Sequence, residues 1–133
     1  MKTTSFVGIA LLIAGSMGAS NAAQAQQVGA KRTDLQRHDL SVPGREVIQV
    51  RVDFEPGYTS PKHTHFGEEI IYVIDGVLEY QVEGQAPVTL KAGEVLVVPA
   101  GTPHLARNVG TTNAAELATY IVEKGKPLIT LVK

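Results

Sequence analysis

The sequence predicts an all-β domain, a sandwich or barrel built from short strands. Three observations favour this class. Short runs of apolar and β-branched residues recur along the chain, each one ended by Gly, Pro or Asn. Several of these runs alternate between apolar and polar residues, as a strand with one buried face does. Helical periodicity is nearly absent beyond residue 25. We therefore expect about seven or eight strands at roughly ten-residue spacing.

The first residues predict a secretory signal peptide. An early lysine precedes the apolar run FVGIALLIAGSMGA, and Ala23-Gln24-Ala25 is a suitable cleavage site. We expect residues 1–25 to be this signal peptide and the protein to be exported, periplasmic or secreted, from a bacterium. A membrane anchor is the alternative. It is disfavoured because the run is shorter than the roughly 20 residues that span a bilayer and is interrupted by Gly15 and Gly18.

The remaining chain, residues 26–133, has the size of one domain. We expect residues 26–40 to be a flexible N-terminal segment and residues 41–133 to form the barrel. The chain has no cysteine, so a bound metal must be held by imidazole and carboxylate groups. Its formal net charge is -1 and its lysines and arginines are scattered. This pattern gives no surface for nucleic acid, and no membrane contact is expected after signal cleavage.

Individual segments support the strand assignment. Residues 46–54 (EVIQVRVDF) alternate, with the apolar side chains on one face. Residues 69–76 (EIIYVIDG) are apolar at most positions, which predicts a strand covered on both faces. Residues 77–85 alternate again and place Tyr80 where it is either a core residue or part of a cavity wall. The apolar stretch 128–132 is expected to add a strand to this barrel or to a neighbouring subunit.

The stretch KHTHFGEE, residues 62–69, contains potential metal ligands. His63 and His65 lie two residues apart, so on a strand both rings project from the same face. A continuous strand would carry Glu69 roughly 13 Å beyond His65, too far for one ion to bind both. The chain must therefore reverse between them. We expect a hairpin at Phe66-Gly67-Glu68, with its glycine at positive φ.

His104 is the residue that could complete the site. It follows the strand and corner VVPAGTP, residues 97–103, beyond which a barrel residue can face the interior. Three neutral imidazoles and a carboxylate would bind a divalent first-row ion. Taken singly these residues mean little: an H-x-H pair is usually on the surface, Glu69 could be a solvated charge and His104 a loop residue. The prediction depends on their joint arrangement.

That arrangement resembles the cupin superfamily. The pattern G-x5-H-x-H-x3-E-x6-G runs from Gly57 to Gly76 and resembles the first cupin motif. The pattern G-x5-P-x-G-x2-H-x3-N runs from Gly93 to Asn108 and resembles the second. The resemblance implies a double-stranded β-helix, or jelly-roll, barrel of two packed antiparallel sheets, usually a homodimer. It also implies one divalent transition metal (Mn, Fe, Ni, Cu or Zn) per chain, with the ligands His63, His65, Glu69 and His104.

The reaction stays open, because cupins include oxygenases, oxidases, decarboxylases, isomerases, epimerases and binding proteins. The ligand set resembles that of quercetinase-type and germin-type cupins. We expect a metal-dependent oxidoreductase, dioxygenase-like, acting on a small anionic, enolic or phenolic molecule. Glu69 would be a metal ligand that also accepts a proton. The alternative is a non-catalytic exported module that binds a metal or a small ligand. A sugar isomerase or epimerase would need an acid–base pair, and none is visible in the sequence.

Overall fold

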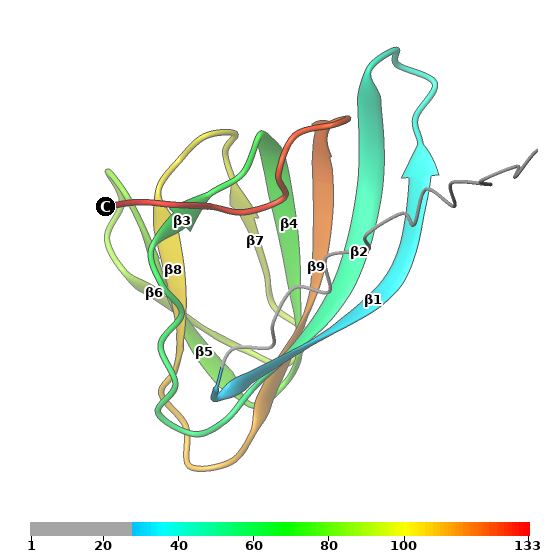
Figure 1. Cartoon of the computed structure of the whole chain (residues 1–133). Coiled ribbons are helices and arrows are strands. Elements are labelled where there is room, and N and C mark those ends of the chain that lie inside the picture. Colours follow the sequence, from blue (N-terminus) through cyan, green and yellow to red (C-terminus); the bar gives the residue numbers. More distant parts are fainter. Residues whose placement is uncertain (1–27) are drawn as a thin grey trace, which may run out of the picture.

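The structure of the protein, a computed structural model, describes residues 28–133. Within these residues the chain forms ten strands and no helix (Figure 1). The strands make two five-stranded antiparallel sheets that face each other as two layers. The all-β fold class predicted from the sequence is confirmed. No helix of the described part is long and apolar enough to cross a membrane. The expected signal peptide lies outside the described residues.

The first sheet has the order β1-β2-β9-β4-β7. Its longest contact joins β2 to β9 over their whole lengths, from Arg45 opposite Glu123 to Phe54 opposite Ala114. Its strands are β1 (Ala30–Asp39), β2 (Arg45–Phe54), β4 (Gly67–Asp75), β7 (Val95–Val98) and β9 (Ala114–Glu123).

The second sheet has the order β10-β3-β8-β5-β6 and is made of shorter strands. The C-terminal strand pairs with β3 of the same chain, which decides where the apolar tail lies. The strands are β3 (His63–Thr64), β5 (Val77–Val82), β6 (Val88–Lys91), β8 (His104–Asn108) and β10 (Thr130–Leu131).

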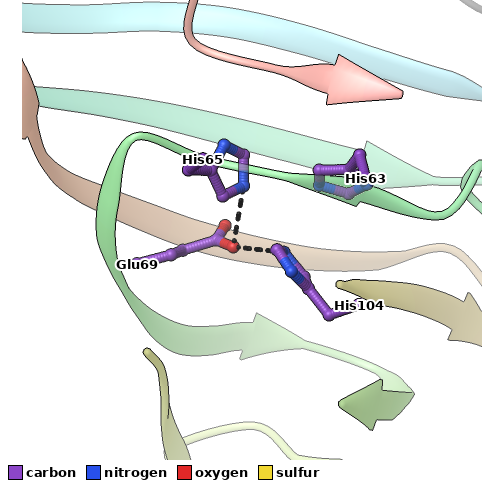
Figure 2. A group of neighbouring side chains, drawn as sticks. All are labelled: His63, His65, Glu69 and His104. Carbon is purple, nitrogen blue, oxygen red and sulfur yellow. Dashed lines mark hydrogen bonds and ion pairs between the residues drawn. The ribbon is translucent and has the colours of Figure 1, made fainter. Parts of the chain in front are cut away.

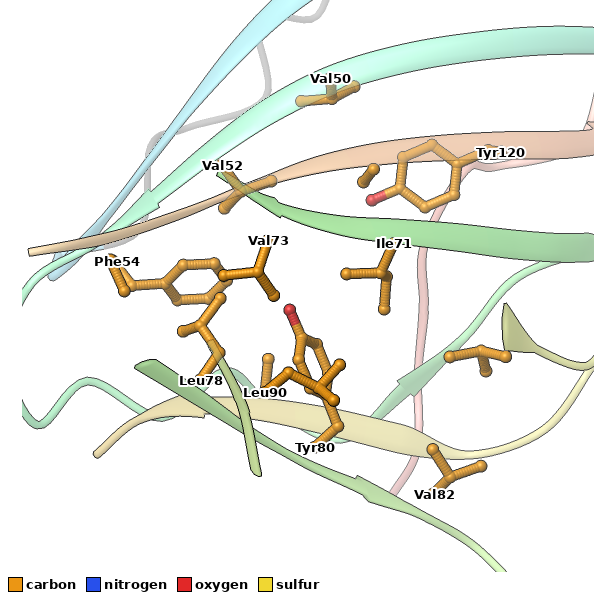
Figure 3. Packing of buried hydrophobic residues seen from close by; sticks show 14 of the residues in the cluster. Val50, Val52, Phe54, Ile71, Val73, Leu78, Tyr80, Val82, Leu90 and Tyr120 are labelled. Atoms are coloured by element: carbon orange, nitrogen blue, oxygen red, sulfur yellow. The ribbon is translucent and has the colours of Figure 1, made fainter. Parts of the chain in front are cut away.

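The core lies between the two sheets (Figure 3). The alternation predicted over residues 46–54 is confirmed, because every second residue of β2 is buried. Phe54 and Val52 point from the first sheet toward Leu78 and Tyr80 of the second. Each large apolar side chain buried in this way contributes about 1.5–3 kcal/mol relative to an exposed one. The core therefore holds together the two sheets that carry the site.

The expectation of a flexible segment over residues 26–40 is corrected by β1. Residues 30–39 pair with β2 along its length, from Ala30 opposite Phe54 to Asp39 opposite Glu46, with one irregularity between Asp34 and Gln36. Most of these side chains are exposed, so no apolar alternation marks the strand. The backbone hydrogen bonds to β2 satisfy its polar groups instead. The barrel therefore begins near residue 30 rather than at residue 41.

The second correction concerns β4, which was expected to be covered on both faces. One face, with Ile71 and Val73, packs in the core. On the other face Ile70, Tyr72 and Ile74 keep between 36% and 46% of their surface exposed in this chain. The continuous apolar pattern therefore reflects an apolar outer face that nothing in the described part of the chain covers.

Candidate metal centre

Four side chains meet between the sheets, at the end of the barrel where β3 lies beside β8 (Figure 2). They come from β3, the loop after it, β4 and β8. Their potential ligand atoms all lie within 4.8 Å of one another, so the group could hold a metal ion. The residue from β3 is partly buried and the other three are buried. The four residues are those singled out from the sequence: His63, His65, Glu69 and His104.

The chain brings Glu69 to the histidines by changing sheets. β3 belongs to the second sheet and β4 to the first, so the predicted hairpin at residues 66–68 is wrong. Gly67 does not take a positive φ. A Cβ atom there would lie 1.9 Å from the carbonyl oxygen of Ile121 and 2.7 Å from the Cα atom of Val122. A glycine is therefore required at position 67, where the chain crosses between the sheets and its backbone packs directly against β9.

A turn at Gly101 and the pairing of β8 with β3 determine where His104 of the second motif lies. Gly101 has a φ of +68°, and its N–H donates to the carbonyl oxygen of His65 at 3.0 Å. Beyond the corner, His104 in β8 pairs directly with His63 in β3. Asn108 donates hydrogen bonds to backbone groups, among them the carbonyl of Phe54 at 3.0 Å. The corner and the register together bring His104 beside the ligands of the first motif.

The three imidazoles share one hydrogen-bonding arrangement. Each Nδ1 lies between 2.5 and 2.8 Å from a backbone carbonyl oxygen, and these oxygens belong to Pro61, Leu128 and Thr102. A carbonyl only accepts, so each Nδ1 must carry a proton. In the neutral ring the lone pair then sits on Nε2. This is the tautomer and orientation that histidines commonly have when they bind a metal.

The Nε2 atoms face Glu69. His104 Nε2 lies 2.9 Å from Oε2 of this carboxylate, and His65 Nε2 lies 3.3 Å from the same oxygen (Figure 2). His65 Nε2 is buried and has no hydrogen-bond partner among the described residues. A buried nitrogen lone pair is costly unless something binds it. A cation placed among these atoms would satisfy it, so the donor set fits a metal ion.

The protonation states of two of the four residues, His63 and Glu69, also suit a cation. The pKa of His104 is raised, because burial, which would lower it, is outweighed by the contact with Glu69. Burial is the main reason that the pKa of His63 is lowered to about 4, with its histidine neighbours lowering it further. Burial would raise the pKa of Glu69, but the imidazoles of His104 and His65 outweigh it and lower that pKa. Near neutral pH the carboxylate is therefore ionised and His63 is neutral. Both are the forms that bind a divalent ion.

A cavity of about 320 Å³ opens beside the four residues. Tyr80 lines it and also packs in the core, so it has both of the roles considered for this residue. Three further polar residues in its wall, Arg32, Glu116 and Tyr120, were missed from the sequence. Glu116 accepts a hydrogen bond from the Tyr80 hydroxyl. Burial raises the pKa of Glu116 to about 8, and the charge of Glu69 adds to the effect. The alternation of β9 could have revealed Glu116 as an inward residue.

Two antiparallel sheets packed around a buried group of three histidines and one glutamate define a small β-barrel protein with a potential metal site. The profile of the Cupin domain matches residues 50–122, which is more than half of the chain. The chain therefore belongs to the cupin superfamily, as its two motifs predicted.

Curated relatives and solved structures agree with this assignment. The chain is 40% identical over 88 residues to Germin-like protein 1-1 of Oryza sativa subsp. japonica, covering 60% of this chain and 41% of the relative. It is 36% identical over 87 residues to Germin-like protein subfamily 2 member 2 of Arabidopsis thaliana, covering 59% and 40%. The structure of an oxalate oxidase in complex with the substrate analogue glycolate has a TM-score of 0.64 and 30% identity, covering 81% of this chain and 57% of the other. The matches thus span about 40% of the curated relatives' length.

Proposed function

We propose that the protein is a metal-dependent oxidoreductase, dioxygenase-like, that acts on a small anionic, enolic or phenolic molecule. One observation carries the proposal: three imidazoles are held by backbone carbonyls through Nδ1, and the Nε2 atoms of two of them lie within 3.3 Å of one buried carboxylate. The likeness to an oxalate oxidase structure at 30% identity supports an oxidoreductase. A cavity beside the site gives a small molecule access to it.

The residues that would hold the ion are His63, His65, Glu69 and His104, with one divalent ion of Mn, Fe, Ni, Cu or Zn per chain. When bound, such an ion supplies Lewis-acid and, for the redox-active metals, electron-transfer chemistry. The protein's own contribution is orientation. The three carbonyl acceptors fix the rings, and the buried carboxylate of Glu69 is held beside two of them.

Glu69 would have a second role as a proton acceptor. Its side chain is 4% exposed and Oε2 faces two imidazoles, so the other carboxylate oxygen is the one left to receive a proton from a substrate. Tyr80 and Glu116 supply a second polar pair in the wall of the same cavity. These groups would position a substrate and keep its charged end away from the apolar core.

The test is metal content and oxygen uptake measured on the same samples. The parent chain, H63A and H104A would be purified from the exported fraction, with H38A as the control because His38 lies on exposed β1 away from the site. About one ion in the parent and in H38A, and none in the other two variants, is expected. Oxygen uptake with carboxylic, enolic or phenolic compounds should follow the metal. Metal with no uptake across the panel would favour the non-catalytic binding module, and no metal in the parent would refute the site.

We also propose that the protein is exported after removal of residues 1–25 and that it is a homodimer. The dimer would use the apolar outer face of β4 and its neighbour β7, which we call the outer patch. An exposed apolar face of this kind often marks a contact surface, and a twofold pair buries the same patch on both copies. The outer patch consists of Ile70, Tyr72, Ile74, Val95 and Val97.

A further inference from the structure

Arg32 on β1 places a positive charge in the wall of the cavity that contains the metal site. It pairs in register with Val52, whose side chain is buried in the core, and it lies on the inner face of the sheet. Its one side-chain hydrogen bond among residues 28–133 runs from Nη2 to the hydroxyl of Tyr120, at 3.3 Å. It forms no salt bridge with a carboxylate of those residues. The other N–H groups of the guanidinium are therefore available to a ligand.

Tyr120 lies between Arg32 and the metal site. Its ring centre is 4.7 Å from that of His65, and the guanidinium carbon of Arg32 is 5.9 Å from the same tyrosine ring. The guanidinium carbon is therefore no more than about 11 Å from the centre of the His65 ring, the upper limit that these two distances allow. A short molecule can span this interval, with one end at the candidate ligands and the other at Arg32.

The charges of the cavity favour an anion with two charged ends. Arg32 and Glu69 carry opposite charges, and a divalent ion at the candidate metal centre would add two positive charges. The remaining carboxyl, Glu116, is hydrogen-bonded by Tyr80 and forms no salt bridge with Arg32. A ligand with an anionic group at each end would therefore meet a positive charge at each end. The wall of the same cavity also includes the apolar side chains of Val52, Phe54 and Ile71, which suit a hydrocarbon link.

We propose that Arg32 is a specificity-determining residue that binds the second carboxylate of a short dicarboxylate, whose first carboxylate binds at the metal site. The guanidinium fork matches a carboxylate with two parallel hydrogen bonds, which a lysine cannot supply. The inference rests on the proposed function for the metal end of the ligand. It adds the chemical class of the molecule and the residue that selects it.

The test compares two four-carbon acids, succinate and butyrate, by titration calorimetry on zinc-loaded protein, because zinc prevents redox turnover. We expect the parent to bind succinate at least about 10-fold more tightly than butyrate, as one charge-assisted pair would give. R32Q should lose this preference and keep the parent's affinity for butyrate. R32K should keep part of the preference, because the charge stays while the fork is lost. The control R107Q changes an exposed arginine of β8 outside the cavity and should behave as the parent.

Zinc content and thermal unfolding of each sample separate the outcomes. If the parent holds zinc but shows no preference, or if folded, zinc-loaded R32Q keeps it, the role of Arg32 is overturned and the metal site stands. If the parent holds no zinc under any loading condition, the metal site is refuted. The role of Arg32 is then refuted as well, because the first carboxylate has no anchor.

Discussion

Replacing Glu116 by glutamine should stabilise the metal-free protein at neutral pH, although it removes a buried hydrogen-bonded acid. Glu116 is 4% exposed and its carboxyl accepts a hydrogen bond from Tyr80, whose hydroxyl points into the barrel in Figure 3. No cation pairs with this carboxyl among the described residues. Burial and the charge of Glu69 therefore raise its pKa to about 8, from an ordinary value of 4.5.

The magnitude follows from the two protonation states. Below pH 4.5 both the folded and the unfolded chain hold the proton, and Glu116 contributes no pH dependence. Above pH 4.5 the unfolded chain releases the proton while the folded chain keeps it until about pH 8. The free energy of unfolding therefore falls with rising pH in this window, by about 1.4 kcal/mol for each pH unit. At pH 7 the loss amounts to about 3 kcal/mol. The glutamine of E116Q has no proton to release, so this variant avoids the loss of stability.

The assay is urea unfolding of the chelator-treated protein at several pH values from 4.5 to 8. E116Q should remove the part of the slope that Glu116 causes and be more stable than the parent at pH 7 by up to about 3 kcal/mol. The matched control is E46Q. Glu46 is also buried but is paired with Arg37 at 2.9 Å, so this variant should lose stability instead. A parent and an E116Q variant with equal slopes, or an E116Q less stable than the parent at pH 7, would refute the reasoning.

Three further predictions follow. G67A should destabilise the protein by more than about 2 kcal/mol, because the new Cβ would meet the backbone of Ile121. The control G84A, at positive φ in open space, should cost about 1 kcal/mol, and urea unfolding measures both. Deletion of residues 127–133 should lower metal affinity about 10–100-fold by removing the acceptor of His65 Nδ1, as competition with a chelator would show, and unchanged affinity would contradict this. I70E in the outer patch should convert the proposed homodimer to a monomer in sedimentation while metal content stays unchanged; a parent that is already monomeric contradicts the interface.

The sequence could predict the fold and the four candidate ligands because both depend on local spacing. Period-two alternation along β2 and β5 reflects burial of one face, and each motif places its histidines within a few residues of a turn. The route between His65 and Glu69 was wrong for a reason that no local pattern shows. The chain must reverse direction between His65 and Glu69 whether it forms a hairpin or crosses to the other sheet. The close contact of Gly67 with β9, which shows that the chain crosses, is visible only in the structure.

The cavity wall was harder to predict because its polar residues come from distant strands. Arg32 lies on β1, where most side chains are exposed and the strand depends on backbone pairing with β2. Without an apolar pattern, nothing local distinguishes such a strand from a flexible segment. Tyr120 and Glu116 alternate with Ala118 on β9, but their meeting with Arg32 and Tyr80 requires the pairing of strands far apart in the chain.

The origin of the four candidate ligands in opposite sheets has a consequence for the order of assembly. Glu69 belongs to the first sheet, whereas His63 and His104 belong to the second, so the site does not exist until the layers have closed. An ion could be captured only after the layers meet, and it would then link two layers that no disulfide joins, since the chain has no cysteine. The supply of ions in the compartment where the barrel closes, more than the affinity of the loose chain, would decide which metal the finished protein carries.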